Sequence, residues 1–547
     1  MVISLTIKNS WIGGVKRLAG IISPEQWVAV AALFLAVAST AYSFAMGYII
    51  SYGDAESHLN IAKRVVDSLT PGFAQLGGIW LPLPHLLLIP FVYSDFLWRT
   101  GLAGSIVSGA CFIVSAVFLY KTVFLVSKNR AAALFGALVF ILNPNILYLQ
   151  TTPMSELVLI VFFILSTYYF IKYVGDQSDL PALLLAAFYG FCATISRYDG
   201  WFLVAIEAVV LILLPLAGAP KSPGKFWQFA KSSYKKIEGK AVLFSTLAFF
   251  GIILWFGWGW LILGDPLYFT DSDYSAKSQQ LAWAARNELP GKGHAVVSFL
   301  YYFVTSMSNA GVIMFTLAIF GLAVYLFKNK SPGRWFVAAV LLAPFIFNVL
   351  SLYLGQSVIF IPSLTPTSYD WTLFNVRYGV MMVPCVAFCA GYLFSQIRPG
   401  GRSLLAILSV LQIGLFVVGY SPVISMQDGV VGLSSEIHQV PDAQYFVDKN
   451  YDGGLVLQDD FARTISIIKS PIPMKNTIYV GNKPYYQESL QEPEKYARWI
   501  FMQQNDEIWK ALYDDPAMQG RLYKYFTKVY TSPTILIFKR NNVPEQS

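Results

Sequence analysis

The 547-residue sequence predicts a polytopic all-α membrane protein with about eleven transmembrane helices, followed by a small C-terminal extracytoplasmic α/β domain. Composition is the first reason for this prediction. The hydrophobic fraction is 56% and the charged fraction only 13%, whereas soluble domains average about 45–50% and about 25%. The second reason is that the apolar residues form long runs, and a helix needs about 20 of them to cross a bilayer. This composition excludes a cytosolic enzyme, a disordered chain and a fibrous protein.

The first predicted span, 26–50, follows Lys8, Lys16 and Arg17. It is longer than the apolar core of a cleaved signal peptide, which is about 7–15 residues. We therefore expect it to remain as an anchor, with the N-terminus in the cytoplasm. The further predicted spans are 101–127, 131–149, 154–173, 181–197, 200–217, 241–263, 296–327, 335–355, 377–397 and 403–420.

The apolar segment 80–94 decides the predicted topology. It is short and contains three prolines, so we expect it to lie along the membrane surface. If it spanned the membrane, the basic stretch 218–240 would face outward, against the positive-inside rule. With 80–94 at the surface, basic turns around Lys128, Lys328 and Arg398 also face the cytoplasm. Most of the basic residues behind the net charge of +8 are then expected in cytoplasmic loops that face anionic lipid, and no nucleic-acid partner is expected.

Two domains follow from this topology. The first, 1–420, is transmembrane and carries amphipathic helices in its first external loop, 51–100. The second, 421–547, is extracytoplasmic, and its short apolar runs alternate with helix-like stretches as is typical of a small α/β domain. The apolar runs are 454–458, 477–480, 499–502 and 535–538, and the helix-like stretches are 485–496 and 506–526.

Acidic residues open the helix of the first external loop. Asp54 and Glu56 lie just after the first span, where the polar head of a lipid-borne substrate would be presented. A carboxylate there can accept the proton of an attacking hydroxyl or hold a divalent cation on a phosphate. The alternative is that Asp54 is an N-cap and Glu56 a first-turn acid. His58, one turn later, is either a partner of Asp54 in a proton network or metal site, or a plain surface residue. His85 and Trp80 are candidates for sugar or lipid contact; the alternative is that they are ordinary aromatic residues at the membrane interface.

Three arginines lie at the outer ends of predicted spans: Arg99, Arg197 and Arg377. The planar fork of arginine pairs bidentately with phosphate, and its charge is costly near hydrocarbon unless it is paired. Each arginine singly could snorkel to the headgroups. Together with the acidic pair, the three predict an anion-binding site. Glu156, at the outer start of the fourth span, is a further carboxylate at this level; the alternative is a first-turn helix acid.

The order and sidedness of these motifs over about residues 50–400 resemble the GT-C superfamily of polyprenyl-phosphate-sugar glycosyltransferases. The nearest members are protein O-mannosyltransferases and the aminoarabinose transferase of lipid A. The matching positions are Asp54-Ala55-Glu56, Leu81-Pro82-Leu83-Pro84-His85-Leu86, Arg99, Glu156 and Arg377-Tyr378. The chain departs from these relatives because Ala55 separates the two acids, and because 421–547 does not look like the sugar-binding domain of eukaryotic O-mannosyltransferases.

The resemblance implies a multi-pass cell-membrane glycosyltransferase with an external active site. It would move a hexosyl or pentosyl unit, with inversion, from a polyprenyl-phosphate donor in the membrane lipid to a hydroxyl of a protein, lipid or glycan. Asp54 would be the general base and Glu56 would orient it or bind the sugar or a cation. Arg377, helped by Arg99 or Arg197, would hold the phosphate. The supporting residues would be Glu156, His58, His85 and Tyr378.

Cofactor use is left open by the sequence, because Asp54 and Glu56 are compatible with a Mg or Mn ion or with none. Two other classes of function also stay open. A lipid or solute transporter would line its path with intramembrane charges. A non-catalytic scaffold would use the outer domain to recruit partners.

Overall fold

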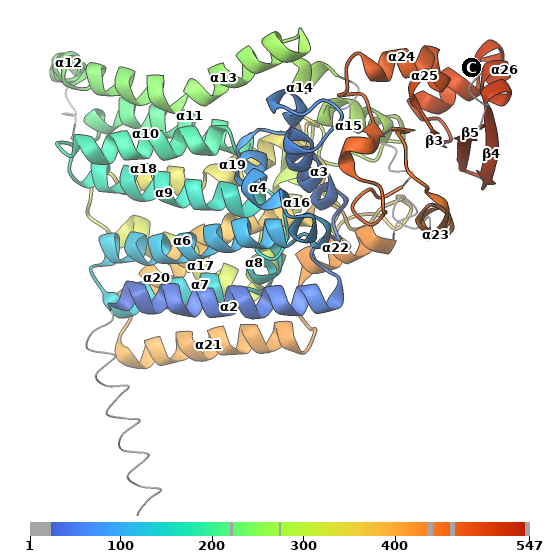
Figure 1. The fold of residues 1–547 in the computed structure, drawn as a ribbon. Coiled ribbons are helices and arrows are strands. Elements are labelled where there is room, and N and C mark those ends of the chain that lie inside the picture. Colours follow the sequence, from blue (N-terminus) through green and yellow to red (C-terminus); the bar gives the residue numbers. More distant parts are fainter. Residues whose placement is uncertain (1–22, 219–222, 273–274, 435–440, 460–464, 542–547) are drawn as a thin grey trace, which may run out of the picture. The chain divides into compact units, whose positions relative to one another are not determined.

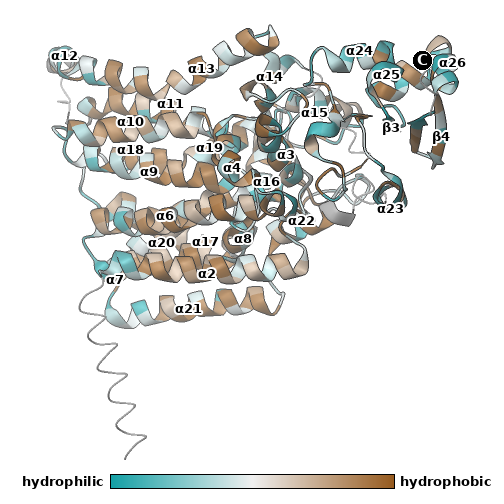
Figure 2. Ribbon diagram, in the orientation of Figure 1, coloured by the Kyte–Doolittle hydropathy of each residue, from teal (hydrophilic) through white to brown (hydrophobic). Residues whose placement is uncertain are grey.

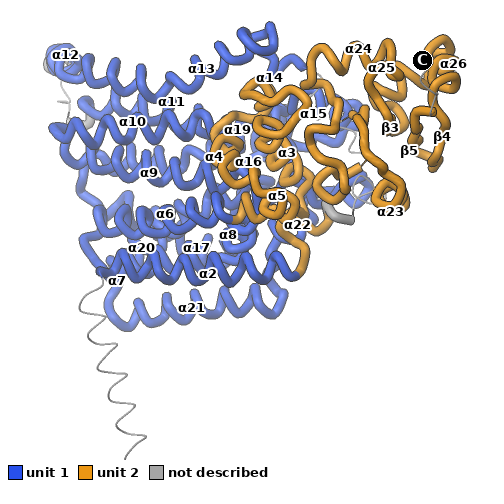
Figure 3. The backbone as a smooth tube through the Cα atoms, viewed as in Figure 1, with its two compact units in different colours: residues 1–45, 106–428 blue, residues 46–105, 429–547 orange. Residues whose placement is uncertain are grey.

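The computed structural model describes residues 23–218, 223–272, 275–434, 441–459 and 465–541, and it is mostly helical with a small sheet near the C-terminus (Figure 1). The chain divides into two compact units (Figure 3). Unit 1 comprises the residues up to Ala45 together with Ile106–Asp428, and unit 2 comprises Met46–Ser105 together with Gly429–Ser547. The sequence analysis assigned the first external loop to the transmembrane domain. In the structure, its contacts group it with the C-terminal segment.

Long apolar helices make up most of unit 1, and hydrophobic residues predominate along them (Figure 2). Among the described residues, seven helices are long and apolar enough to cross a membrane, or up to nine if each bent pair is one span. The seven are α2 (Pro24–Met46), α6 (Leu102–Ser127), α9 (Glu156–Gly175), α11 (Asp199–Leu213) with η2 (Leu214–Gly218), α12 (Pro223–Ala248) with α13 (Phe250–Trp258) and η3 (Gly259–Leu263), η4 (Val376–Met382) with α20 (Val383–Gln396), and α21 (Pro399–Val417). The bent pairs are α16 (Ala295–Ala310) with α17 (Val312–Lys328), and α18 (Arg334–Leu341) with α19 (Ala343–Tyr353). The chain is therefore a multi-pass membrane protein.

The predicted number of eleven spans is not confirmed. The expected span 296–327 is instead two helices that meet at 111°. The bend lies at Gly311, whose φ of 85° is a conformation that favours glycine. Another expected span, 131–149, is interrupted because Asn143 caps a new helix by accepting a hydrogen bond from the backbone of Ile146. This gives α7 (Arg130–Ile141) and α8 (Pro144–Leu149). The expected span 181–197 is the short α10 (Leu180–Thr194).

Basic turns lie at the end of unit 1 opposite to the start of α9. Lys172, in the last turn of α9, pairs with Asp179 just before α10, with Nζ 2.8 Å from Oδ2. The turn before α18 lies at the same end, because a Cβ on Gly333 would meet the side chain of Val174. The predicted orientation of the first span depends on Lys8, Lys16 and Arg17. The predicted cytoplasmic position of the stretch 218–240 depends in part on Lys221. These four residues lie outside the described residues.

Small residues let α20 pack closely between α7 and α17. A Cβ on Gly321 of α17 would overlap the carbonyl of Cys389 in α20, and Gly136 of α7 lies similarly close to Ala387. Glycine at such positions lets helix backbones approach each other in a membrane bundle. This packing fixes α20 and, directly before it in the chain, η4, which carries Arg377.

Unit 2 begins with the first external loop. Its helices are α3 (Gly53–Val66), η1 (Phe73–Leu76), α4 (Leu83–Val92) and α5 (Asp95–Thr100). The predicted amphipathic helix is confirmed as α3, which buries Ala55, Leu59 and Ala62. The segment 80–94 forms α4, and ten residues are too few to span a bilayer.

The C-terminal segment of unit 2 contains a five-stranded sheet in the order β2-β1-β3-β5-β4. The strands are β1 (Val456–Gln458), β2 (Thr477–Ile478), β3 (Trp499–Gln503), β4 (Phe526–Thr531) and β5 (Ile535–Arg540). β1 pairs in parallel with β2 and β3, whereas β5 pairs antiparallel with β3 and β4. The four predicted strands are present. β4 is an addition to the prediction, because its largely exposed sequence lacks the apolar pattern of a buried strand.

Leu69 of the first external loop packs against the core of this sheet, beside buried residues such as Leu457, Ile500 and Phe538. The sheet core is thus built from segments at the two ends of unit 2's sequence. The remaining helices of the chain are α14 (Tyr268–Asp271), α15 (Ala276–Ala285), α22 (Ile424–Ser434), α23 (Pro441–Asn450), η5 (Met474–Asn476), α24 (Tyr485–Gln491), α25 (Pro493–Tyr496), η6 (Trp509–Tyr513) and α26 (Pro516–Tyr525).

Candidate functional site

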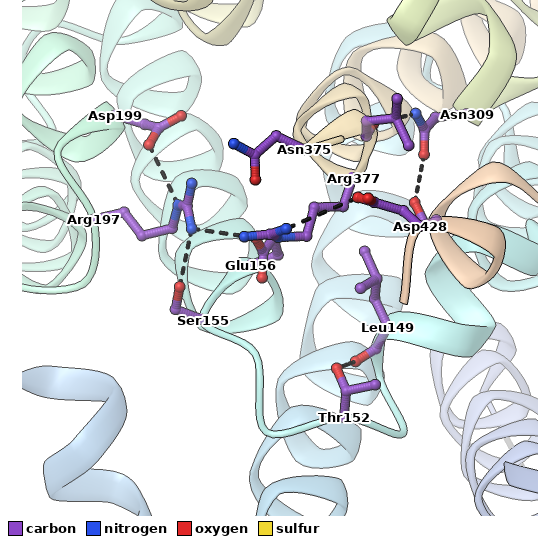
Figure 4. Close-up of polar contacts among 12 residues, drawn as sticks. Leu149, Thr152, Ser155, Glu156, Arg197, Asp199, Asn309, Asn375, Arg377 and Asp428 are labelled. Carbon is purple, nitrogen blue, oxygen red and sulfur yellow. Dashed lines mark hydrogen bonds and ion pairs between the residues drawn. The ribbon is translucent and has the colours of Figure 1, made fainter. Parts of the chain in front are cut away.

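Two arginines and one glutamate meet at one end of unit 1. Glu156 begins α9, and Arg197 follows α10, which packs against α9. Arg377 lies in η4. Arg197 Nη1 and Arg377 Nε both donate to Glu156 Oε1, each at 3.2 Å (Figure 4). Glu156 is 0% exposed, so this carboxylate is removed from solvent and is held between two guanidinium groups.

Further groups extend this charge cluster around the two arginines. Arg197 also donates to Ser155 Oγ at 3.0 Å and pairs with Asp199, with Nε 3.4 Å from Oδ2. Arg377 Nη1 lies 3.8 Å from Asp428 Oδ2 (Figure 4). Burial opposes the charge on Arg197, but Glu156 and Asp199 offset that cost, and the pKa of Arg197 is raised above its ordinary value. Both guanidinium groups are therefore charged and held in fixed orientations.

Tyr378 lies beside both arginines. Its ring centre is 5.1 Å from the guanidinium carbon of Arg197 and 5.2 Å from that of Arg377. Such distances allow cation–π attraction, which adds to the electrostatic hold on the two side chains. The sequence predicts one anion-binding site with Arg197 and Arg377, with Glu156 at the same level and Tyr378 as a supporting residue. The structure brings these four residues together.

Residues that the sequence analysis did not name fix the position of η4. Asn309 Nδ2 donates to the carbonyl of Val376 at 2.7 Å, and Ser425 Oγ donates to Asn309 Oδ1 at 2.7 Å. Asp428 was also missed, because 421–547 was read as a separate domain. The available signal was an acid a few residues beyond the last predicted span.

One atom of the charge cluster lacks a partner in the described part of the chain. Glu156 Oε2 is buried and accepts no hydrogen bond there. Leaving a buried acceptor unsatisfied costs about 1–3 kcal/mol, and more when it is charged. The cluster can therefore accept a further hydrogen bond from a hydroxyl or a water molecule.

The acidic pair of the first external loop lies in unit 2. Asp54 and Glu56 are both in the first turn of α3 and are partly exposed. The N-cap residue is Tyr52, so the N-cap alternative for Asp54 is wrong. Ser466 Oγ lies 2.9 Å from both carboxylate oxygens of Glu56.

The acidic pair does not fit a metal by itself. Residues two positions apart on a helix do not face each other, so the carboxylates of Asp54 and Glu56 diverge. Glu56 is also engaged by Ser466. Among the described residues, no group of three or more His, Cys, Asp or Glu side chains could hold a metal ion.

His58 and His85 form a buried pair in unit 2. His58 Nδ1 lies 2.8 Å from His85 Nε2, and the His58 ring lies 4.6 Å from the ring of Trp80. His58 is 3% exposed, so the surface position considered for it is wrong. Burial, reinforced by His58, lowers the pKa of His85 well below its ordinary value, so His85 stays neutral.

Arg99 is also in unit 2, where it binds main-chain carbonyl groups. Its Nη1 donates to the carbonyls of Ile467, Ile468 and Ser470 at 2.5–3.2 Å, and its Nη2 donates to Ile472 at 3.3 Å. The donors of this arginine are therefore directed at one loop of the C-terminal segment.

Comparison with solved structures identifies the fold. The chain superposes on ArnT from Cupriavidus metallidurans bound to undecaprenyl phosphate with a TM-score of 0.51, 11% identity, and coverage of 93% of this chain and 98% of that one. A match with a TM-score of 0.47 and 12% identity is the archaeal oligosaccharyltransferase AglB from Archaeoglobus fulgidus, in complex with an inhibitory peptide and a dolichol-phosphate; it covers 96% of this chain and 74% of that one. No protein-family model matches the sequence, and no curated protein matches it either. The chain has the predicted GT-C fold, as ArnT does.

Proposed function

We propose that this chain is a glycosyltransferase that uses a polyprenyl-phosphate sugar as donor and acts on the outer face of the cell membrane. The observation that carries the proposal is the pair of guanidinium groups of Arg197 and Arg377 around Glu156, at one end of a GT-C fold. ArnT, which has the same fold, was solved with undecaprenyl phosphate bound, and this supports the same class of lipid here. The basic turns at the opposite end support a cytoplasmic location for that end.

The surroundings of the cluster suit a lipid phosphate. Two oriented guanidinium groups can neutralise a phosphodiester, and pairing of this kind is often the largest catalytic contribution. A small, mostly apolar cavity borders Asp199, so apolar side chains lie directly beside the charge cluster. Its other lining residues include Leu159, Ile160, Phe163, Leu203, Pro344 and Met381. Glu156 Oε2 would accept a hydrogen bond from a donor hydroxyl.

In the proposed reaction, Asp54 accepts the proton of the acceptor hydroxyl while the hydroxyl oxygen attacks the anomeric carbon of the donor sugar. The bond between that carbon and the phosphate oxygen breaks, and polyprenyl phosphate leaves with its negative charge paired to Arg377 and Arg197. The anomeric configuration inverts. Glu56 orients the acidic helix, and the buried His58–His85 pair supports it. The mechanism requires the base and the phosphate-binding arginines to reach the same donor molecule.

Release of polyprenyl phosphate tests the proposal. The purified protein, in proteoliposomes, is incubated with radiolabelled undecaprenyl-phosphate hexoses and pentoses and with envelope extracts as acceptors. We expect acceptor-dependent release of undecaprenyl phosphate for at least one sugar. A transporter or a scaffold would leave the bond between sugar and phosphate intact. The proposal is overturned if no donor releases undecaprenyl phosphate and the intact donor is only moved or retained.

Arg197→Lys should weaken binding of the donor phosphate. A lysine carries a point charge and cannot serve Ser155, Glu156 and Asp199 at once, so it would be misdirected at the phosphate. We expect affinity for undecaprenyl phosphate, measured by native mass spectrometry, to fall about tenfold, in keeping with the loss of one charge-assisted hydrogen bond. Arg286→Lys, at a half-exposed arginine that also pairs with an acid two residues away, is the matched control and should bind normally.

A further inference from the structure

The C-terminal segment contacts the acidic helix through a loop that the proposed mechanism has not used. Residues 465–472, here called the strap, contain Ser466, which hydrogen-bonds Glu56, and the carbonyl groups that Arg99 binds. Glu56 and Arg99 both belong to the first external loop, and each is about 370 positions or more from its partner in the strap. The strap thus joins the two segments of unit 2 next to the proposed base.

We propose that Ser466 is a positioning residue for the acidic helix α3, and that Arg99 anchors the strap which presents it. This inference rests on the proposed function, and it assigns the C-terminal segment to the assembly of the catalytic helix. Arg99 is one of the three arginines that the sequence associated with phosphate. In this inference its hydrogen-bond donors bind backbone carbonyl groups of the strap.

The contact of Ser466 is directed at the first turn of α3. Its Oγ is 2.9 Å from both oxygens of Glu56, so the hydroxyl holds the carboxylate in one orientation. Its own backbone is fixed, because Ser466 N donates to Gln444 Oε1 at 3.1 Å. Glu56 is two residues after Asp54 in the same turn, and a rigid first turn fixes the direction of the Asp54 carboxylate as well.

Arg99 gives the strap its shape. Four carbonyl groups of an irregular loop converge on one guanidinium. The carbonyl of Ile467 also accepts from the backbone N–H and the hydroxyl of Ser470, whereas the other three lie outside any helix or strand ladder that would supply a donor. The buried side chains of Ile467, Ile468 and Ile472 fix the same loop from its apolar side. An ammonium group has three donors on one atom, so lysine cannot reproduce this arrangement.

The other end of α3 is held by the same C-terminal segment. The guanidinium carbon of Arg64, in the last turn, lies 3.9 Å from the ring centre of Tyr479. Just beyond the helix, Asn482 Nδ2 donates to Thr70 Oγ1 at 2.9 Å. Ser466 contacts the first turn and Tyr479 contacts the last turn, so the C-terminal segment holds both ends of the helix that carries Asp54.

The test compares Ser466→Ala and Ser466→Thr in the full chain in nanodiscs. For Ser466→Ala we expect kcat to fall about 10- to 100-fold, as misplacement of a catalytic group does, with the KM for undecaprenyl-phosphate sugar unchanged. Ser466→Thr keeps the hydroxyl and should restore most of the rate. The matched control is Ser489→Ala, at a buried serine of the same segment whose Oγ has no hydrogen-bond partner in the described chain; its rate should be normal.

Hydrogen–deuterium exchange gives a readout that does not depend on turnover. Ser466→Ala and Arg99→Lys should speed exchange in residues 53–58, as local opening becomes easier. Arg521→Lys, at a partly exposed arginine of the same segment that pairs with Glu492 and Glu494, should leave that exchange unchanged. Unaltered exchange of residues 53–58 in both Ser466→Ala and Arg99→Lys would overturn the inference. If wild-type protein turns over no donor, the proposed function fails, and exchange alone then decides whether the strap holds the helix.

Discussion

Asp54→Asn is expected to lower sugar transfer by a factor on the order of 10²–10⁴, the usual contribution of a general base. The substitution keeps the size of the side chain but removes its ability to take the proton of the acceptor hydroxyl. Binding of undecaprenyl phosphate should be retained, because the proposed phosphate ligands are Arg377 and Arg197. The measurement is the single-turnover rate with purified protein that is already loaded with donor.

The control for this experiment is Asp442→Asn. Asp442 is an exposed aspartate in the first turn of another helix of unit 2, so the chemical change and its helix position are matched. We expect its transfer rate to equal that of the wild type. Near-normal transfer by loaded Asp54→Asn protein would remove Asp54 from the role of base, whatever the control does.

Glu156→Gln is expected to have the largest effect on stability. It leaves the charges of Arg197 and Arg377 without their shared carboxylate, and Glu156 is fully buried. Removing one member of a buried ion pair costs about 3–5 kcal/mol. The free energy of unfolding, measured by denaturant titration of the purified protein in mixed micelles, should fall by up to about that amount, because Asp199 and Asp428 still offset part of the charge of the two arginines.

Glu207→Gln is the matched control. Glu207 is also 0% exposed, but its carboxylate is hydrogen-bonded by Ser166 and forms none of the ion pairs found among the described residues. A glutamine there can keep that hydrogen bond, so unfolding should change little. Equal effects of the two substitutions would mean that the pairing of Glu156 with the arginines contributes no more than ordinary packing.

Hydropathy predicted the architecture because burial in a bilayer needs long apolar runs and little else. The same reasoning could not detect breaks inside those runs. Gly311 permits a sharp bend and Asn143 caps a new helix, but both residues stand in apolar sequence that also suits an unbroken span.

For the site, sidedness was the useful signal. Glu156, Arg197 and Arg377 were assigned to the same end of the spans, and the structure joins them in one cluster. Arg99 has the same signal in the sequence, yet it binds main-chain carbonyls 368 to 373 positions later. Carbonyl partners carry no sequence signature, and Ser466 is one serine in a loop. Such long-range contacts are set by the folding of unit 2.

The split composition of unit 2 has a consequence for how the protein is made. Leu69 and its neighbours emerge from the ribosome early, but the sheet that covers Leu69 is encoded after residue 429. At about 5–20 residues per second, synthesis of the intervening segment takes tens of seconds. In the proposed orientation, the first loop is translocated during that interval and still lacks its packing partner. We therefore expect the nascent chain to depend on extracytoplasmic chaperones or on the bilayer surface until translation ends.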